Sequence, residues 1–194
     1  APLFKKLHLE LGGNNALLVL PDADLEAAAS AGAWGSFLHQ GQICMTTGLI
    51  LAHEKIVTKL TELMVAKATH LPVGDPASQQ VALGPLISER QRDRVHGIVQ
   101  DSVKQGAHLA AGGTYDRLFY KPTVLTGVKP GMRAFEEEVF GPVASIVSFS
   151  SEDEAVELAN RTIYGLSLGV ISTSVGRAMA LANRIPTGLL HIND

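Results

Sequence analysis

The chain has 194 residues, of which 46% are hydrophobic, and this suffices for one sizeable core. The net charge is −3 with acids and bases mixed along the sequence, and no apolar run reaches the roughly 18 residues of a membrane span, so we expect neither nucleic acid nor membrane as partner. A single cysteine excludes an internal disulfide framework and, without a signal-peptide core near the start, predicts a cytoplasmic protein.

The first half of the sequence alternates apolar runs with helical periodicity. Residues 16–20 form a continuous apolar run, which is typical of a strand buried on both faces. A helix is predicted from Leu25 to about Leu38. Because it contains Gly32 and Gly35, which lower helix propensity, we expect a close packing neighbour there. The other elements predicted in this half are a strand at residues 49–52 and a helix at residues 55–70.

The second half repeats this alternation. Ser88 and Ser151 each stand three residues before a glutamine or glutamate, and this capping-box spacing predicts helices from 88 to about 106 and from 151 to about 160. The remaining predictions are strands at residues 108–111, 121–125, 143–149, 167–171 and 189–192, and a helix at residues 175–183. Strands that alternate with helices predict an α/β fold in one domain, with a mainly parallel sheet covered on both faces.

Some common chemical motifs are absent or stand in the wrong context. No stretch matches the dinucleotide fingerprint or the P-loop. The seven histidines are scattered without the spacing of zinc ligands, so no metal site is expected. Gly165-Leu166-Ser167-Leu168-Gly169 matches the nucleophile elbow of serine hydrolases. Its serine leads into a predicted strand instead of leaving one, which argues against a serine nucleophile.

Three other stretches fit together as one site. Cys44 lies between a helix-like and a strand-like run, where a thiolate can attack a carbonyl. Glu10 precedes two glycines, and Glu138 begins an acidic-aromatic turn. A thioester formed on cysteine is broken by water, which a carboxylate can activate. Taken singly, each has a plainer reading, namely a small buried hydrophobe, a strand end and a solvated acidic face.

Together these stretches resemble the aldehyde dehydrogenase superfamily. Glu10-Leu11-Gly12-Gly13 is similar to its glutamate motif, Gly41-Gln42-Ile43-Cys44 to its cysteine motif, and Glu138-Val139-Phe140-Gly141-Pro142 to its third signature. Further family motifs follow in order at Gly74-Asp75-Pro76, Gly84-Pro85-Leu86, Tyr164-Gly165-Leu166 and residues 188–193. The resemblance covers essentially the whole chain.

The resemblance implies oxidation of an aldehyde to a carboxylic acid with NAD or NADP. Cys44 would form a thiohemiacetal and then a thioester, its backbone N–H would help to hold the oxyanion, and Glu10 would activate the hydrolytic water. Glu138 would hold the nicotinamide ribose, and Gly12 is also expected among the cofactor-binding residues. Phe140 would pack near the nicotinamide, unless it is simply a core aromatic residue.

The resemblance also implies a domain organisation. In the family the cysteine-bearing domain is a three-layer α/β/α unit with a mainly parallel central sheet. We expect residues 1–194 to be this catalytic domain, with the amino-terminal dinucleotide-binding domain and the carboxy-terminal oligomerisation segment of a homo-oligomeric parent lying outside them. Two alternatives stay open, a folded but inactive piece and a cofactor-independent thiol esterase that uses Cys44 and Glu10. Oxidation to an acyl-CoA is a weaker alternative, because Glu10 serves hydrolysis.

The loop around the cysteine indicates the class of aldehyde substrate. Residues 39–45 resemble the loop of benzaldehyde, vanillin and salicylaldehyde dehydrogenases. Apolar side chains near the thiol would suit a flat aromatic aldehyde, and those expected in the substrate pocket are Trp34, Leu38, Ile43 and Met45. The alternative is that Trp34 and Leu38 pack the helix into the core.

Overall fold

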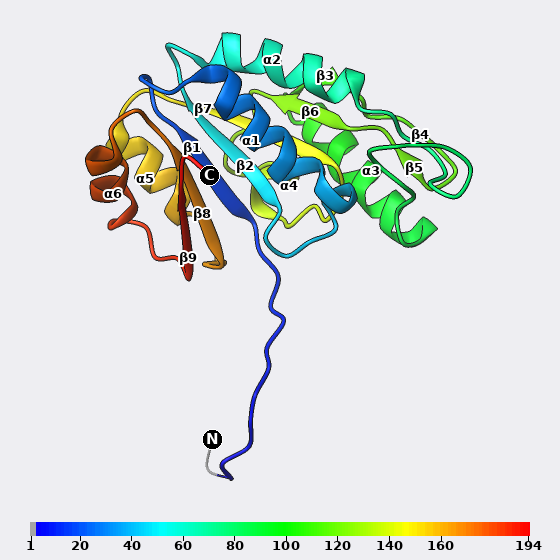
Figure 1. Cartoon of the computed structure of the whole chain (residues 1–194), viewed down its shortest axis with the longest axis horizontal. Coiled ribbons are helices and arrows are strands. Elements are labelled where there is room, and N and C mark those ends of the chain that lie inside the picture. The colour runs from blue at the N-terminus through cyan, green and yellow to red at the C-terminus, as the bar shows by residue number, and fades with distance from the viewer. Residues whose placement is uncertain (1–2) are drawn as a thin grey trace.

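A computed structural model describes residues 3–194 and shows a seven-stranded sheet between two layers of helices (Figure 1). The elements are β1 (Asn15–Val19), α1 (Leu25–Phe37), the 3-10 turn η1 (Leu38–Gly41), β2 (Thr47–His53), α2 (Val57–His70), α3 (Glu89–Lys104), β3 (His108–Ala111), β4 (Tyr115–Asp116), β5 (Phe119–Tyr120), β6 (Thr123–Thr126), α4 (Arg133–Glu136), β7 (Val143–Phe149), α5 (Glu152–Asn160), β8 (Ser167–Ile171), α6 (Val175–Ala182) and β9 (Leu189–Ile192). The strand order is β3-β6-β7-β2-β1-β8-β9. Only β3 and β6 pair antiparallel within this sheet, so the predicted mainly parallel α/β fold is confirmed.

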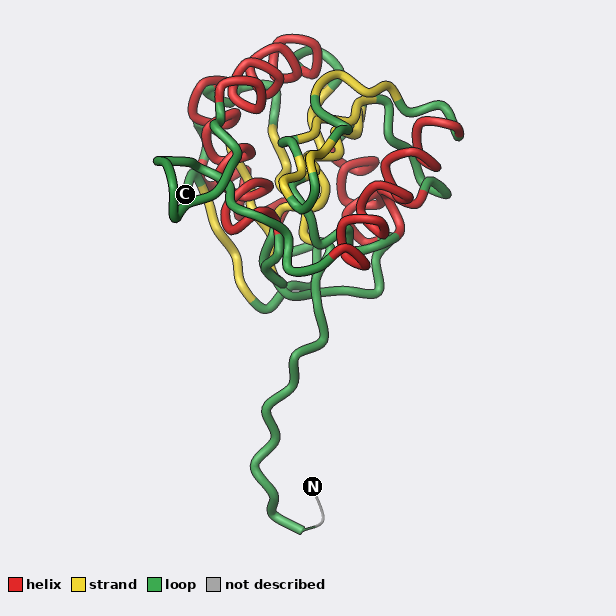
Figure 2. Tube along the Cα trace, turned by 90° about the vertical axis from the view of Figure 1, so that its right-hand side faces the viewer, coloured by secondary structure: helices red, strands yellow, loops and turns green. Residues whose placement is uncertain are grey.

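The two faces of the sheet are buried by different helices. Successive strand residues point to opposite faces. Leu17 and Ile50 pack with α1 and α2, whereas Leu18 and Leu51 belong to the core formed with α3, α4, α5 and α6. Figure 2 shows the strands between helices on both sides. Because neither face meets water, the central strands read as continuous apolar runs instead of alternating ones.

The predicted caps and the close approach of α1 are confirmed. The hydroxyls of Ser88 and Ser151 each accept a hydrogen bond at 3.2 Å from the backbone N–H three residues on. Such a cap typically contributes about 1 kcal/mol. A Cβ at Gly35 would lie 2.3 Å from Oγ1 of Thr47, and one at Gly32 would lie 3.1 Å from Sδ of Met64. Gly35 therefore lets α1 lie against the start of β2, near the cysteine, and Gly32 lets it approach α2.

Four local features differ from the sequence prediction. The second helix begins at Val57, two residues later than predicted, and β6 begins after Pro122, which has no N–H for a ladder. The hairpin of β4 and β5 was not predicted, because strands of two residues carry no measurable periodicity. Helix α1 ends at Phe37, and η1 follows with His39 and Gln40 in left-handed conformations.

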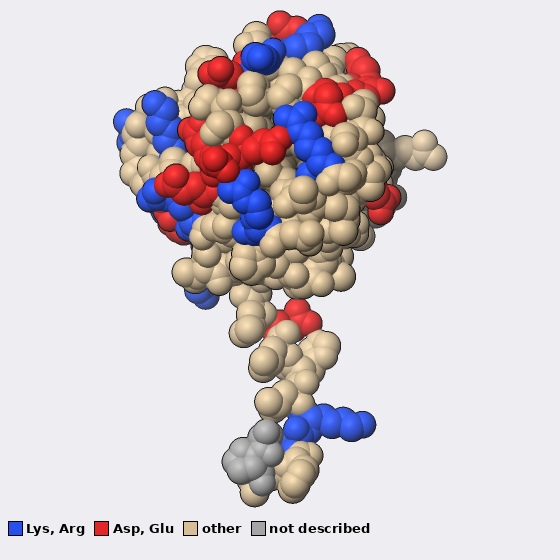
Figure 3. All heavy atoms as spheres, turned by 90° about the vertical axis from the view of Figure 1, so that its left-hand side faces the viewer, with Lys and Arg blue, Asp and Glu red and all other residues tan. Residues whose placement is uncertain are grey.

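Charged groups on the described surface are mixed in sign. Figure 3 shows acidic and basic side chains interspersed on one face, and the ion pairs at α5 and α6 include Arg184 with Asp153 at 2.7 Å and Arg177 with Glu152. Within residues 3–194, no helix combines the length and apolar character that a membrane crossing requires. The same part of the chain contains no group of three His, Cys, Asp or Glu side chains placed to hold a metal.

An ion-pair cluster fixes α4, the element that leads into the third signature. Nε of Arg133 donates to Oε1 of Glu137 at 2.6 Å, and its Nη1 donates to Oδ2 of Asp101 on α3 at 2.8 Å. Nη2 of Arg94 donates to the second oxygen of Glu137 at 3.2 Å. The hydrogen bond from Arg133 lowers the pKa of Glu137 below its ordinary value of 4.5.

Glu137→Gln is expected to weaken the acid sensitivity of the fold. Because the pKa of Glu137 is lower in the folded than in the unfolded chain, its contribution to the unfolding free energy is complete above pH 4.5 and is lost as the pH falls through the lowered value. In urea titrations of this chain, the unfolding free energy should therefore fall less between neutral pH and pH below 4.5 in Glu137→Gln than in the wild type. An equal fall in the two proteins would contradict this assignment.

Candidate active site

Glu10 lies in a segment that extends from the body of the domain. Residues 3–12 form neither helix nor strand and project away from the sheet (Figures 1 and 2). The side chain of Glu10 is exposed, and its Oε1 lies 2.8 Å from Nε2 of His8. The segment joins the body at Gly12 and Gly13, immediately before Asn14 and β1. Glu10 is therefore accessible to water and makes little contact with the core.

The cysteine lies in the connection from α1 to β2 and is half-buried. Ahead of it, His39, Gln40 and Gly41 all have positive φ angles, and these turn the chain sharply. A Cβ at Gly41 would lie 2.1 Å from the carbonyl oxygen of Gly141. Only glycine allows this approach, so the cysteine motif packs directly against the third signature.

The third signature also contacts the glutamate motif. Oε1 of Glu138 accepts a hydrogen bond from the backbone N–H of Gly13 at 3.0 Å. A Cβ at Gly12, where φ is +76°, would lie 2.6 Å from Oε2 of Glu138, so a side chain there would collide with the carboxylate. The structure thus brings together the predicted cofactor residues Glu138 and Gly12, which are far apart in sequence.

Phe140 adopts an uncommon backbone conformation in the same turn. Its φ is 54°, which is left-handed and costly for a bulky residue. Nε2 of Gln91, on α3, donates to the carbonyl oxygen of Phe140 at 2.7 Å, and Nη1 of Arg94 donates to that of Val139 at 2.9 Å. Phe140 is half-buried, so it is not part of the buried core.

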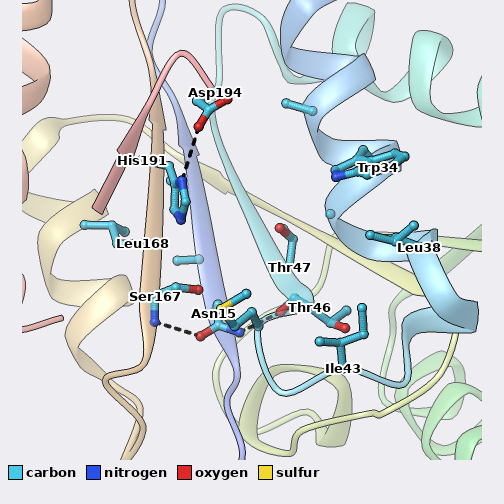
Figure 4. A pocket seen from close by; sticks show the side chains of 15 residues that line it. Asn15, Trp34, Leu38, Ile43, Thr46, Thr47, Ser167, Leu168, His191 and Asp194 are labelled. Atoms are coloured by element: carbon cyan, nitrogen blue, oxygen red, sulfur yellow. Dashed lines mark hydrogen bonds and ion pairs between the residues drawn. The ribbon is translucent and has the colours of Figure 1, made fainter. Parts of the chain in front are cut away.

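Two cavities meet beside the cysteine. The first, of about 640 Å³, is lined by Leu9, Glu10, Leu11, Gly12, Cys44, Met45 and residues 163–166. It brings Glu10 and Cys44 to one space. The second, of about 270 Å³, is lined by the four predicted pocket residues Trp34, Leu38, Ile43 and Met45 (Figure 4). Met45 lines both cavities, so they adjoin there.

The walls of the second cavity come from α1, the cysteine loop and the far strands of the sheet. Trp34 is 68% exposed and Leu38 half-buried, so Trp34 does not pack the helix into the core. The opposite wall includes Ser167 and Leu168 of β8 and His191 of β9 (Figure 4). The role of this cavity in substrate binding stays a prediction.

Sequence reasoning missed one polar residue at the site, Asn15. Its Nδ2 donates to the carbonyl oxygens of Cys44 at 2.9 Å and Thr46 at 2.8 Å, and its Oδ1 accepts from the N–H of Ser167 at 3.0 Å. Asn15 is buried, with 5% of its surface exposed. The only signal in the sequence is a polar residue at the start of an apolar run.

Comparison with known proteins gives one consistent family. Residues 1–194 match the model of the aldehyde dehydrogenase family. A vanillin dehydrogenase from Amycolatopsis sp. is 58% identical over 190 residues, and a benzaldehyde dehydrogenase [NAD(+)] from Pseudomonas putida is 50% identical over 192 residues. The alignments cover 98% and 99% of this chain but 39% of each relative, so the chain spans about two fifths of their length.

Solved structures agree with this match. A succinate-semialdehyde dehydrogenase from Burkholderia pseudomallei has a TM-score of 0.95 and 38% identity, with 99% of this chain and 40% of that chain covered. A betaine aldehyde dehydrogenase from Staphylococcus aureus, solved in complex with NAD+, has a TM-score of 0.91 and 35% identity, with 95% and 38% covered. The resemblance seen in the three motifs is thereby confirmed, and the chain belongs to the aldehyde dehydrogenase family.

Proposed function

We propose that residues 1–194 are the cysteine-bearing catalytic domain of a longer aldehyde dehydrogenase, called the parent enzyme below. The parent enzyme oxidises aromatic aldehydes to carboxylic acids with NAD or NADP. The observation that carries the proposal is that Cys44 and Glu10 line one cavity, which adjoins an apolar cavity at Met45. The dinucleotide-binding domain and oligomerisation segment lie in the parent enzyme outside these residues, and the parent is a homo-oligomer.

Cys44 is the proposed nucleophile. Its thiolate attacks the carbonyl carbon of the aldehyde and forms a C–S bond, and the former carbonyl oxygen becomes the oxyanion of the tetrahedral thiohemiacetal. Among the described residues 3–194, no group accepts a hydrogen bond from the backbone N–H of Cys44, so this N–H can donate to the oxyanion. One donor of this kind typically contributes about 3 kcal/mol in acyl chemistry.

Glu138, Gly12 and Phe140 are the residues proposed to hold the nicotinamide end of the cofactor. Gly13 fixes one oxygen of the Glu138 carboxylate, which leaves acceptor capacity for a ribose hydroxyl. Gly12 has no side chain to fill the space beside that carboxylate. The strained backbone of Phe140 is held by Gln91 and would set the ring against a planar group. When bound, NAD(P)+ supplies the oxidant that accepts the hydride.

Glu10 is the proposed base for hydrolysis. After the two-electron oxidation the acyl group is held on Sγ of Cys44 as a thioester, and water must attack its carbonyl carbon. Glu10 is exposed in the same cavity, so its carboxylate can take a proton from that water. Attack by the water breaks the C–S bond, releases the acid and returns the thiol of Cys44.

Oxidation of benzaldehyde by the parent enzyme, followed as NADH, tests the proposed function and its aromatic preference. Trp34→Ala removes the largest apolar side chain from the second cavity. It should lower kcat/KM for benzaldehyde about tenfold, as expected when a pocket loses apolar contact. The value for acetaldehyde should change less than about twofold, because a short chain makes little contact with that wall.

Val175→Ala is the matched control, since Val175 is also exposed and apolar but lies on α6. Equal losses for both aldehydes in Trp34→Ala would contradict the aromatic pocket. If the parent enzyme reduces neither NAD+ nor NADP+ with aromatic or aliphatic aldehydes, the proposed function is wrong. The isolated chain should give no NADH, because the other cofactor contacts lie outside it.

A further inference from the structure

The cysteine loop meets the sheet at a point where backbone pairing is interrupted. Along β1 and β2, Asn15 pairs with Thr47, whereas Ala16 pairs with Leu49, so the register shifts between these positions. The carbonyl groups of Cys44 and Thr46 precede β2, where no strand residue of β1 continues the ladder. Both carbonyl groups accept a hydrogen bond from a side chain at this point.

The side-chain amide of Asn15 fills this gap. Both hydrogens of Nδ2 are used, one on Cys44 at 2.9 Å and one on Thr46 at 2.8 Å. Its Oδ1 is held from the other side by the N–H of Ser167, the first residue of β8 (Figure 4). Asn15 therefore joins β1, the cysteine loop and β8, and its buried position excludes competing water.

Two further contacts fix the same part of the loop. The N–H of Thr46 donates to the carbonyl oxygen of Ile43 at 3.0 Å, which closes a turn with Cys44 and Met45 at its tip. A Cβ at Gly13 would lie 2.2 Å from the carbonyl oxygen of Cys44, so that oxygen is seated against bare backbone. The turn places Cys44 on the tip, and Asn15 contacts the carbonyl groups on either side of Met45.

We propose that Asn15 is a positioning residue that orients Cys44 for attack by holding the carbonyl groups on either side of Met45. The inference rests on the proposed function of Cys44, and Asn15 itself touches neither aldehyde nor cofactor in this role. A misplacement of about 1 Å at a reacting group can cost about 100-fold in rate. Loss of both donors should therefore reduce the rate of turnover more than it reduces cofactor affinity.

Substitution of Asn15 by aspartate distinguishes the donor role of the side-chain amide from its acceptor role. Asn15→Asp keeps the size of the side chain and an acceptor for the N–H of Ser167, but the ionised carboxylate has no donor for Cys44 or Thr46. Asn15→Ala removes both roles. If positioning depends on the donors, the two variants should lose activity alike. If only the link to β8 matters, Asn15→Asp should behave like the wild type.

Hydrogen exchange on this chain tests, without any catalysis, whether Asn15 holds the cysteine loop in place. In Asn15→Asp and Asn15→Ala, the amide of Thr46, which donates to Ile43 within the turn, should exchange at least about tenfold faster than in the wild type, while the amides of α5 stay unchanged. Asn160→Ala is the matched control, because Nδ2 of Asn160 also donates to a backbone carbonyl, that of Arg184 at 3.1 Å. Unchanged exchange at the amide of Thr46 would overturn the proposal.

Kinetics of the parent enzyme test whether Asn15 orients Cys44 for attack. Both Asn15 variants should lower kcat with benzaldehyde about 100-fold, with KM for the nicotinamide cofactor within about twofold of wild type. The proposal would be overturned if kcat is unchanged in both variants, or if Asn15→Asp has the kcat of the wild type. Equal changes in kcat and in KM for the cofactor would also overturn it. If Asn15→Ala does not fold, Asn15→Ser takes its place. A parent enzyme without any activity would refute the proposed function, and the exchange result would still decide whether Asn15 holds the loop.

Discussion

Cys44→Ala is expected to abolish aldehyde oxidation by the parent enzyme, with kcat lowered at least about 1,000-fold. Without Sγ there is no thiohemiacetal, and an aldehyde held only by the pocket has no covalent intermediate from which a hydride can leave. The measurement is NADH formed from benzaldehyde at saturating cofactor. The expected loss is larger than that of any other single substitution at the site.

Folding of the variant can be separated from its chemistry. Cys44 is half-buried in a loop and belongs to neither core cluster, so the thermal midpoint of this chain should change little in Cys44→Ala. Because it is the sole cysteine, alkylation with iodoacetamide should fall from one thiol per chain to none. A variant that keeps more than about a tenth of wild-type kcat would contradict a cysteine nucleophile.

Glu10→Gln is expected to leave the first turnover intact and to slow every later one. Formation of the thioester does not require a base for water, whereas its hydrolysis does. Benzaldehyde and NAD+ should therefore give a burst of about one NADH per site and then a steady state about 100-fold or more below wild type. Rapid mixing with absorbance detection measures both phases.

The position of Glu10 makes this variant easy to interpret. Its exposed side chain contacts His8 and no core residue, so the substitution should not change stability. Glu62→Gln is the matched control, since Glu62 is an exposed glutamate on α2 that pairs with Lys59. A wild-type steady state in Glu10→Gln would show that another group activates the water. A slowed burst would place Glu10 in an earlier step.

The layers of the fold could be predicted from local sequence because the central strands are buried on both faces. Residues 16–20 are apolar throughout and residues 143–149 are mostly apolar. This pattern and the caps at Ser88 and Ser151 involve residues that are close together in sequence, so they can be recognised without the fold. The hairpin of β4 and β5 gave no such signal. Its short strands are fixed by contacts with α3, including Tyr115 against His96, which only the folded chain provides.

The candidate site was also only partly predictable from the sequence. The order of the three motifs indicated the family, but which residues touch was not readable from local patterns. The contact of Gly41 with Gly141 and the hydrogen bond from Gly13 to Glu138 join residues that are about 100 or more positions apart, and they arise from the order of strands in the sheet. Asn15 was missed because its partners are backbone carbonyls, which every residue carries.

The most direct test of this account is the mass of the Cys44 peptide from Glu10→Gln parent enzyme, quenched in acid just after mixing with benzaldehyde and NAD+. A benzoyl group is expected on Cys44, present only with both reactants and absent in Cys44→Ala. NADH formation without a benzoyl group on this peptide, or with the group on another residue, would contradict covalent catalysis by Cys44.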